Sequence, residues 1–281
     1  KIKSSLSGLN DVFMTEANNF LIKYEKVLAD ISKNFEFSID SYLRMIKDFR
    51  KETVYFMRHG TYSCKSQKEA FEKVYSKPEV MHYYMHGLLL SQVLWKHHYL
   101  MGKFFIDHLS KYRDITSYLE VGGGHGFFID NAVKIMQNCK TFNLIDISDS
   151  SLEISKAFLA ENLSKVNVYK TDVFEYEPNQ KYDFVSMGEV LEHVDNPRAL
   201  LTRLRELMNP DGTLWITTPT NAPAIDHIYL FRNEAEIVDL IEESGFTVDN
   251  YASYFSEEGE RKILEKNNIT LLYGAFLKIK N

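Results

Sequence analysis

A glycine-rich turn between an apolar strand and a helix constrains the fold of this chain more than any other feature. An acidic residue, Glu120, lies near the end of the strand, and glycines follow at alternate positions as Gly122, Gly124 and Gly126. Glycines let a ligand approach the backbone, and the first N–H groups of the helix expected over 127–136 are free to bind it. A strand, a glycine-rich turn and a helix form the first unit of a nucleotide-binding α/β sheet.

The glycine spacing and the segments that follow narrow the class of nucleotide. The pattern is Glu-x-Gly-x-Gly-x-Gly, not the Gly-x-Gly-x-x-Gly of a dinucleotide site, and the sequence lacks the Gly-Lys-Ser/Thr of a P-loop. Apolar strands expected over 141–146, 166–174 and 182–188 bring Asp146, Asp172 and Glu189 to strand ends. Asp146 lies about twenty residues past the turn, where an acid can bind both ribose hydroxyls. The spacing of the glycines disfavours a dehydrogenase. A domain that binds no ligand is also disfavoured, because packing of the core gives no reason for acidic residues at three strand ends.

In their order and on their expected elements, these motifs resemble those of the class I S-adenosylmethionine (SAM)-dependent methyltransferases. Residues 120–126 match the first motif of that family, Asp146 the acid that ends its second strand, and Asp172 the acid that contacts the adenine amino group. Residues 189–194 resemble the fourth-strand signature of the branch that methylates small molecules, including quinone rings, and residues 209–219 resemble the turn into strand five. The resemblance implies a Rossmann-like α/β sheet of seven strands, the last one antiparallel. The SAM-binding residues that it implies are Glu120, Gly122, Gly124, Gly126, Asp146, Ile147, Asp172, Val173 and Gly188.

The chain divides into an N-terminal helical part, 1–112, and a SAM-binding methyltransferase part, 113–281. The spacing of apolar residues predicts helices over 11–32, 38–49 with Ser38 as N-cap, 65–75, 79–94 and 95–109. The last two are apolar almost all round, which is typical of helices that are buried or line a pocket. The second part is expected to hold crossover helices over 152–162, 197–208 and 232–244, a sixth strand from 245, a charged helix over 257–267 and a last strand over 270–278. By its resemblance, the helical part is expected to act as a lid over a small acceptor.

Composition excludes several classes of function. The formal net charge is −6 and no long run of Lys or Arg occurs, which argues against nucleic acid as the substrate. No apolar stretch is long enough to span a bilayer, and the first residues do not form a signal peptide. The two cysteines, Cys64 and Cys139, lie far apart, so a reducing, cytoplasmic compartment is expected. The sequence does not begin with methionine, so a domain of a larger biosynthetic assembly stays an alternative.

Two histidines lie on the loops that would face the methyl group. Methyl transfer to a hydroxyl, amide or carbon acid requires removal of a proton, and a histidine, whose ordinary pKa lies near 6.5, suits this task. His193 is the first candidate for the base and His227 the second, with Glu189 orienting one of them or binding substrate. The alternative for His193 is a structural role beside the cofactor, because such enzymes can act mainly by positioning.

An aromatic segment of the helical part is the candidate acceptor site. Tyr83, Tyr84, His86 and Trp95 could stack on a planar or cationic acceptor. His82 and His86, four residues apart, are also a conceivable metal pair, but a wall of aromatics with hydrogen-bonded histidines is the favoured interpretation, and no metal site is assigned.

We therefore expect an enzyme that transfers a methyl group from SAM to O, N or C of a small molecule, in specialised or cofactor biosynthesis, leaving S-adenosylhomocysteine. The alternatives are a methyltransferase domain that acts on a carrier-tethered intermediate, and a non-catalytic SAM-binding protein. Methylation of a protein is also open. Nothing in the sequence shows an interface, although class I enzymes of this size are often homodimers.

Overall fold

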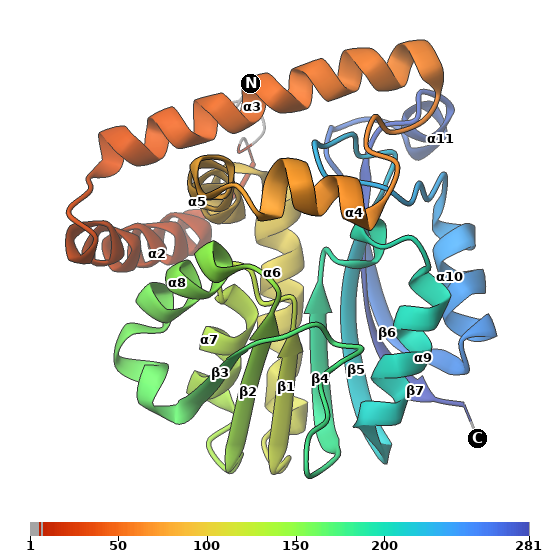
Figure 1. The fold of residues 1–281 in the computed structure, drawn as a ribbon. Helices are drawn as coiled ribbons and strands as arrows, with labels where there is room; N and C mark the ends of the chain where they lie inside the picture. Colours follow the sequence, from red (N-terminus) through yellow and green to blue (C-terminus); the bar gives the residue numbers. More distant parts are fainter. Residues whose placement is uncertain (1–5, 7, 281) are drawn as a thin grey trace.

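A single mixed sheet forms the centre of the computed structural model, which describes residue 6 and residues 8–280 (Figure 1). Its strand order is β3-β2-β1-β4-β5-β7-β6. Strands β3, β2, β1, β4 and β5 pair in parallel, whereas β7 is antiparallel to both of its neighbours. This is the predicted sheet of seven strands whose last strand is antiparallel. The strands are β1 (Ser117–Val121), β2 (Thr141–Asp146), β3 (Val166–Lys170), β4 (Tyr182–Gly188), β5 (Met208–Thr220), β6 (Phe246–Phe255) and β7 (Leu271–Ile279).

Helices cover both faces of the sheet. On one face, α6 (Lys96–Leu109), α7 (Phe127–Ile135) and α8 (Asp149–Leu159) bury an aromatic-rich core that includes Phe105, Tyr118 and Trp215. On the other face, α9 (Pro197–Leu207) and α10 (Glu234–Glu243) bury aliphatic side chains of β1, β4 and β5. The short α11 (Arg261–Lys266) lies between β6 and β7 in the chain. The strand order reverses between β1 and β4, and ligands of open α/β sheets bind at such a switch point, beyond the carboxyl ends of the strands.

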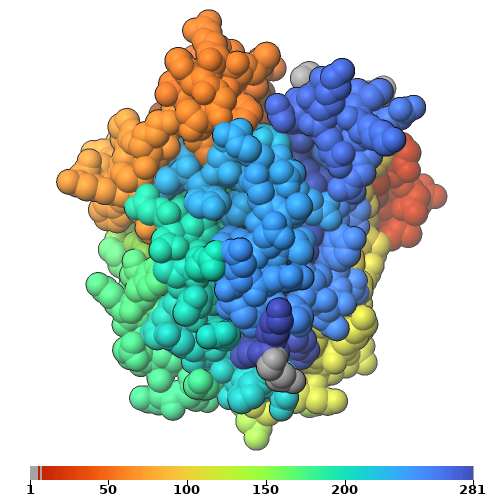
Figure 2. Space-filling model, turned by 90° about the vertical axis from the view of Figure 1, so that its right-hand side faces the viewer, coloured from red at the N-terminus to blue at the C-terminus, as the bar shows by residue number. Residues whose placement is uncertain are grey.

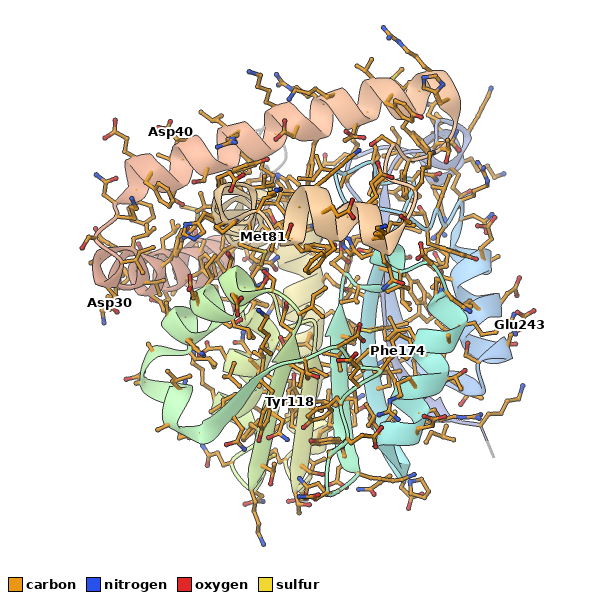
Figure 3. The ribbon with its side chains drawn as sticks, viewed as in Figure 1. Asp30, Asp40, Met81, Tyr118, Phe174 and Glu243 are labelled. Atoms are coloured by element: carbon orange, nitrogen blue, oxygen red, sulfur yellow. The ribbon has the colours of Figure 1, made fainter. Side chains whose placement is uncertain are left out.

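The N-terminal helices lie over that carboxyl end (Figure 1). We call residues 11–94 the helical segment; it comprises α2 (Asp11–Asp30), α3 (Phe35–His59), α4 (Gln67–Ala70), the π-helix η1 (Phe71–Tyr75) and α5 (Pro78–Leu94). A third apolar cluster joins its helices to α8 through Ile154 and Phe158. Figure 3 shows Met81 of α5 above the strand ends and Tyr118 of β1 deep in the sheet. The predicted helical N-terminal region is thus present.

Some predicted boundaries were wrong, each for a local physical reason. Helix α3 begins at Phe35 because the side chain of Asn34, rather than that of Ser38, accepts the capping hydrogen bond from the Phe37 N–H. It continues past Phe49 to His59 and ends at Gly60, whose φ of +66° is the left-handed C-cap conformation. Strand β3 ends at Lys170, so Asp172 lies in the turn after the strand and not within it.

The proposed boundary at residue 112 stays a prediction, although α6 packs into the core of the sheet with Met101, Phe105 and Leu109. Among the described residues, no helix combines the length and the apolar composition needed to cross a bilayer.

Candidate active site

A cavity of about 1290 Å³ lies between the carboxyl ends of the strands and the helical segment. The glycine-rich turn and the loops after β2, β3, β4 and β5 form its floor, and α3, α5 and the start of α6 form its roof. Figure 2 shows that the helical segment (orange) and the α11 region (blue) stand beside each other at this end of the molecule. Lys96 at the start of α6 pairs with Glu258 at an N–O distance of 2.6 Å, so α6 and the loop that precedes α11 meet beside the cavity.

The glycine-rich turn forms one side of the cavity. Gly122 and Gly124 have φ values of +65° and +54°, a backbone conformation that favours glycine. A Cβ on Gly122 would lie 2.7 Å from the Val190 side chain, and one on Gly124 would lie 3.2 Å from Cε of Met85. Gly126, predicted to bind cofactor, does not line the cavity: it precedes α7 with φ +76° and lies against the Ser155 backbone. Its role is therefore to form the turn.

Two buried acids flank this turn. The Asp146 carboxylate accepts hydrogen bonds from the Gly124 N–H (3.0 Å) and the Ser148 N–H (2.8 Å), and burial raises the pKa of Asp146. Glu120 is fully buried, accepts hydrogen bonds from the hydroxyls of Tyr118 and Ser186, and has its pKa raised by burial to about 8. Both acids line the cavity, and each carboxylate has lone pairs beyond those used by its partners.

The other predicted cofactor residues also border the cavity. Ile147, Asp172 and Val173 line it after β2 and β3, and Gly188 lines it at the end of β4; Ile147 is 40% exposed. The Asp172 carboxylate accepts a hydrogen bond from the Phe174 N–H at 2.9 Å, which holds it at the strand end. The glycine-rich turn is open to a ligand, one acid lies at the end of β2 and another follows β3. This arrangement fits a nucleoside, whose ribose and base can each meet one of the acids. The residues present therefore fit SAM.

A polar cluster lies opposite, after β4 and β5. Glu189 has a φ of +56°. A positive φ is uncommon for residues other than glycine, and such residues cluster at functional sites. Its N–H donates to the Thr217 carbonyl at 2.9 Å, and burial raises its pKa to about 7. Glu192 is wholly buried; its Oε2 accepts a hydrogen bond from the Thr218 hydroxyl at 2.8 Å. Burial, followed by the charge of Glu189, raises the pKa of Glu192 well above its usual value.

Hydrogen bonding fixes the tautomer of His193. Its Nδ1 lies 2.9 Å from the Tyr75 hydroxyl and 3.1 Å from the backbone carbonyl oxygen of Asp226. A carbonyl can only accept a hydrogen bond, so Nδ1 carries the proton. Nε2 then presents a lone pair, 3.7 Å from Oε1 of Glu192. His193 is thus set up as a proton acceptor or metal ligand on its Nε2 side.

The cluster also has the composition of a metal site. Glu192, His193 and His227 each offer a ligand atom, and these atoms lie within 4.8 Å of one another. Oε1 of Glu189, Oε1 of Glu192 and Nδ1 of His227 are buried and have no hydrogen-bond partner among the described residues. Burial, with a smaller contribution from the charge of His193, lowers the pKa of His227 to about 3, so this imidazole is neutral. Electron-rich atoms gathered in this way require protons or a cation between them.

Two of the four predicted acceptor contacts do not lie at the cavity. Tyr84 and Trp95 line it. Tyr83 does not: its hydroxyl donates to Asp48 at 2.7 Å and its ring lies under Arg44. His86 is buried against Tyr24, whose hydroxyl lies 2.6 Å from its Nδ1, and burial lowers the pKa of His86 to about 4. Packing within the helical segment thus accounts for both residues, and neither Tyr83 nor His86 lines the cavity.

Sequence reasoning missed Glu192, Asp226 and Tyr75. Glu192 stands three residues after Glu189 and directly before His193, so the pair of acids beside a histidine was a readable signal of a possible ligand set. Asp226 precedes His227 in the loop after β5, and only the fold brings it to His193. Tyr75 is 118 residues from His193 in sequence, and nothing local signals the contact.

Comparison with known proteins identifies the family. A family model described as a methyltransferase domain matches residues 94–272, more than half of the chain. The ubiquinone biosynthesis O-methyltransferase of Rickettsia bellii is 28% identical over 193 residues, which cover 60% of this chain and 78% of that protein.

Solved structures show the same fold at low sequence identity. The mitomycin 7-O-methyltransferase MmcR has a TM-score of 0.57 at 13% identity and covers 83% of this chain and 67% of its own. An O-methyltransferase family protein from Burkholderia thailandensis has a TM-score of 0.57 at 14% identity, over 87% of this chain and 72% of its own. With the sheet order and the match over residues 94–272, the chain belongs to this methyltransferase family and is a class I SAM-dependent methyltransferase.

Proposed function

We propose that this enzyme transfers the methyl group of SAM to a hydroxyl oxygen of a small molecule held in the cavity under the helical segment. The observation that carries the proposal is the cluster of Glu189, Glu192, His193 and His227, of which Glu189, His193 and His227 line the same cavity as the glycine-rich turn. Oxygen acceptors need such a cluster because a neutral hydroxyl is a weak nucleophile until its proton is removed. The similarity to an O-methyltransferase of Rickettsia bellii, named for ubiquinone biosynthesis, supports oxygen as the acceptor atom and a biosynthetic role.

The size of the cavity and the helices that form its roof support a small acceptor bound together with SAM. Its volume of about 1290 Å³ exceeds the roughly 300–1,000 Å³ of typical single-ligand pockets. The roof formed by α3, α5 and α6 would exclude water, which strengthens electrostatic interactions within the site. We propose that the helical segment is the lid of this site and that Tyr84 and Trp95 contact the acceptor.

Each half of the cavity has a separate task. Bound SAM supplies a methyl group on a positively charged sulfur. Asp146 binds the ribose hydroxyls, Asp172 the adenine amino group, and the backbone around Gly122 and Gly124 lies against the cofactor. The cluster after β4 and β5 holds the acceptor hydroxyl in line with the methyl group and takes up its proton, with Nε2 of His193 as the direct acceptor.

The same cluster fits a divalent cation, a role that the sequence analysis did not assign. Glu192, His193 and His227 would hold it together with Glu189, since carboxylate oxygens and imidazole nitrogens are ligands of the kinds that Mg²⁺, Mn²⁺ and Zn²⁺ take. A cation bound there would lower the pKa of an acceptor hydroxyl. In that case His193 acts as a ligand rather than as the base.

The test is an acceptor screen with and without metal. Purified enzyme, treated with EDTA and then supplied with Mg²⁺, Mn²⁺, Zn²⁺ or no metal, is given labelled SAM with phenols, catechols, aliphatic alcohols, amines and carbon acids. We expect label on hydroxyl oxygens, identified by mass spectrometry, and at least a 100-fold loss in His193→Ala. His82→Ala is the matched control, because His82 is exposed on α5 and does not line the cavity.

The outcomes separate the possibilities. Methylation of amines or carbon acids alone would refute oxygen as the acceptor. Activity that disappears with EDTA and returns with one metal would assign the cluster to a cation, whereas activity unaffected by EDTA would assign His193 as the direct base. Methylation of a protein or of a carrier-tethered compound, and a homodimer, stay predictions.

A further inference from the structure

Two of the hydrogen bonds that join the helical segment to the active site converge on one buried carboxylate, that of Asp226. The Tyr84 hydroxyl of α5 donates to Oδ1 at 2.8 Å, and the Tyr75 hydroxyl of η1 donates to Oδ2 at 3.1 Å. Asp226 is 1% exposed, so its carboxylate depends on these partners. A buried carboxylate that loses its donors is strongly destabilised, because the desolvation penalty is then not offset.

Asp226 also contacts His193. Its backbone carbonyl lies 3.1 Å from Nδ1 of His193, and its Oδ2 lies 3.5 Å from the same atom. Tyr75 connects the two residues: its hydroxyl donates to Oδ2 of Asp226 and can accept the hydrogen bond from Nδ1 of His193, 2.9 Å away. A carboxylate behind a histidine that works through its other nitrogen fixes both the tautomer and the orientation of the ring.

The backbone of the helical segment favours this contact. Tyr75 is the last residue of the π-helix η1. Single π-helical turns are rare in proteins, and those that occur often lie at functional sites. The extra residue in such a turn changes the direction of the side chains that follow, and here the hydroxyl of Tyr75 reaches the buried cluster. Tyr75 and Tyr84 are nine residues apart, on two helices, and still bind opposite oxygens of one carboxylate.

We infer that Asp226 is a positioning residue that couples the docked helical segment to His193. With Tyr75 and Tyr84 in place, Asp226 keeps the proton of His193 on Nδ1 and directs Nε2 toward the acceptor. When the segment moves away, both tyrosines leave, the loop that carries Asp226 loses its anchor, and His193 loses its fixed orientation. The active site is therefore complete only when the helical segment is docked on it. This inference rests on the proposed function of His193.

Three variants test the coupling, and a neighbouring tyrosine supplies the control. Tyr75→Phe and Tyr84→Phe each remove one hydroxyl that holds Asp226, and Asp226→Asn removes the charge. Tyr83→Phe removes the same group from the residue next to Tyr84, where it bonds Asp48 away from the cavity. We expect kcat to fall about 10- to 100-fold in Asp226→Asn and in the Tyr75→Phe, Tyr84→Phe double variant, as for other partners that orient a histidine. SAM affinity, measured by calorimetry, should stay within threefold of wild type, and Tyr83→Phe should match wild type throughout.

A spectroscopic measurement separates positioning from a general loss of structure. Nitrogen-15 NMR of protein labelled at histidine distinguishes the two tautomers, and the His193→Ala spectrum assigns the signals of His193. We expect the Nδ1–H form in wild type and in Tyr83→Phe, and a mixture of tautomers in Asp226→Asn and in the double variant. The double variant loses only two hydroxyl groups and keeps both aromatic rings in place. It therefore tests the coupling even if Asp226→Asn fails to fold.

The outcomes distinguish this inference from the function on which it rests. If His193→Ala keeps wild-type kcat, the proposed role of His193 fails, whatever the tyrosine variants do. If His193→Ala is inactive while the double variant keeps both wild-type kcat and the Nδ1–H tautomer, the coupling through Asp226 is overturned. A fall in kcat with an unchanged tautomer would also overturn it, since the tyrosines would then act in another way.

Discussion

Replacing Asp146 with asparagine tests the cofactor half of the site most directly. Oδ1 and Oδ2 of Asp146 each accept one backbone hydrogen bond, from Ser148 and Gly124 respectively, and the carboxylate lines the cavity. An asparagine offers one oxygen and one NH₂ group, so its nitrogen must face one of the two N–H donors. The variant therefore loses one of these two backbone bonds, as well as the proposed charge-assisted bond to a ribose hydroxyl.

The size of the effect follows from these losses. A hydrogen bond to a charged group contributes about 1.5–3 kcal/mol. Since about 1.4 kcal/mol corresponds to a tenfold change in affinity, Asp146→Asn should bind SAM and S-adenosylhomocysteine roughly 10- to 150-fold more weakly. The loss of the backbone bond is expected to appear mainly as a lower free energy of unfolding.

Calorimetric titration of both ligands into wild type, Asp146→Asn and Asp149→Asn measures this loss. Asp149 is the matched control: it is an exposed acid three residues further on, pairs with Lys170 and does not line the cavity. Thermal unfolding of each variant checks the fold. A dissociation constant for Asp146→Asn within threefold of wild type, with an intact fold, would refute the assignment of Asp146 to the ribose.

Three further predictions concern stability and metal binding. Gly126→Ala should lower the free energy of unfolding in urea by about 1–3 kcal/mol, because a Cβ at φ +76° would lie 3.3 Å from the Ser155 backbone; Gly60→Ala, at φ +66° with no atom within 4 Å, should lose less. The pKa of Glu120 is about 8 in the folded protein and 4.5 in the unfolded chain, so the folded state binds one more proton than the unfolded state between these two pH values. Stability should therefore fall as pH rises from about 4.5 to 8, and Glu120→Gln should flatten that slope in urea titrations at several pH values. If a cation binds the cluster, Mn²⁺ or Zn²⁺ should raise the Tm of wild type and of His82→Ala but not of Glu192→Gln; an equal rise in Glu192→Gln would place the cation elsewhere.

The sheet and the cofactor half were readable from sequence because their signals are local. The strand, turn and helix around Gly122 and Gly124 lie within one short segment, and Asp146 follows at the spacing that the next strand imposes. Alternation of strands and helices predicted the parallel core, and the antiparallel β7 followed from the family that these motifs resemble. Such features require no knowledge of distant contacts.

The helical segment was less readable because its helices are fixed by packing and by single caps. Asn34 and Ser38 are both good N-cap residues, and only the contact of the Ser38 hydroxyl with the buried Tyr24 hydroxyl places Ser38 inside α3. Tyr83 and Tyr84 adjoin in sequence and differ in function because successive helical positions point in directions about 100° apart. One faces α3 and Asp48, the other the cavity and Asp226.

The active-site cluster was the least readable part, and charge balance explains why its members must lie together. Glu189, Glu192 and Asp226 are three acids near one another under the helical segment, and burial of three carboxylates without compensation would be prohibitive. Asp226 is compensated by two tyrosine hydroxyls and lies next to the Nδ1 of His193. Glu189 and Glu192, with raised pKa values and one unpartnered oxygen each, need either protons or a cation. The helical segment thus supplies the donors for one acid, whereas Glu189, which lines the cavity, and Glu192 depend on protons or a cation, as the proposed transfer to a hydroxyl requires.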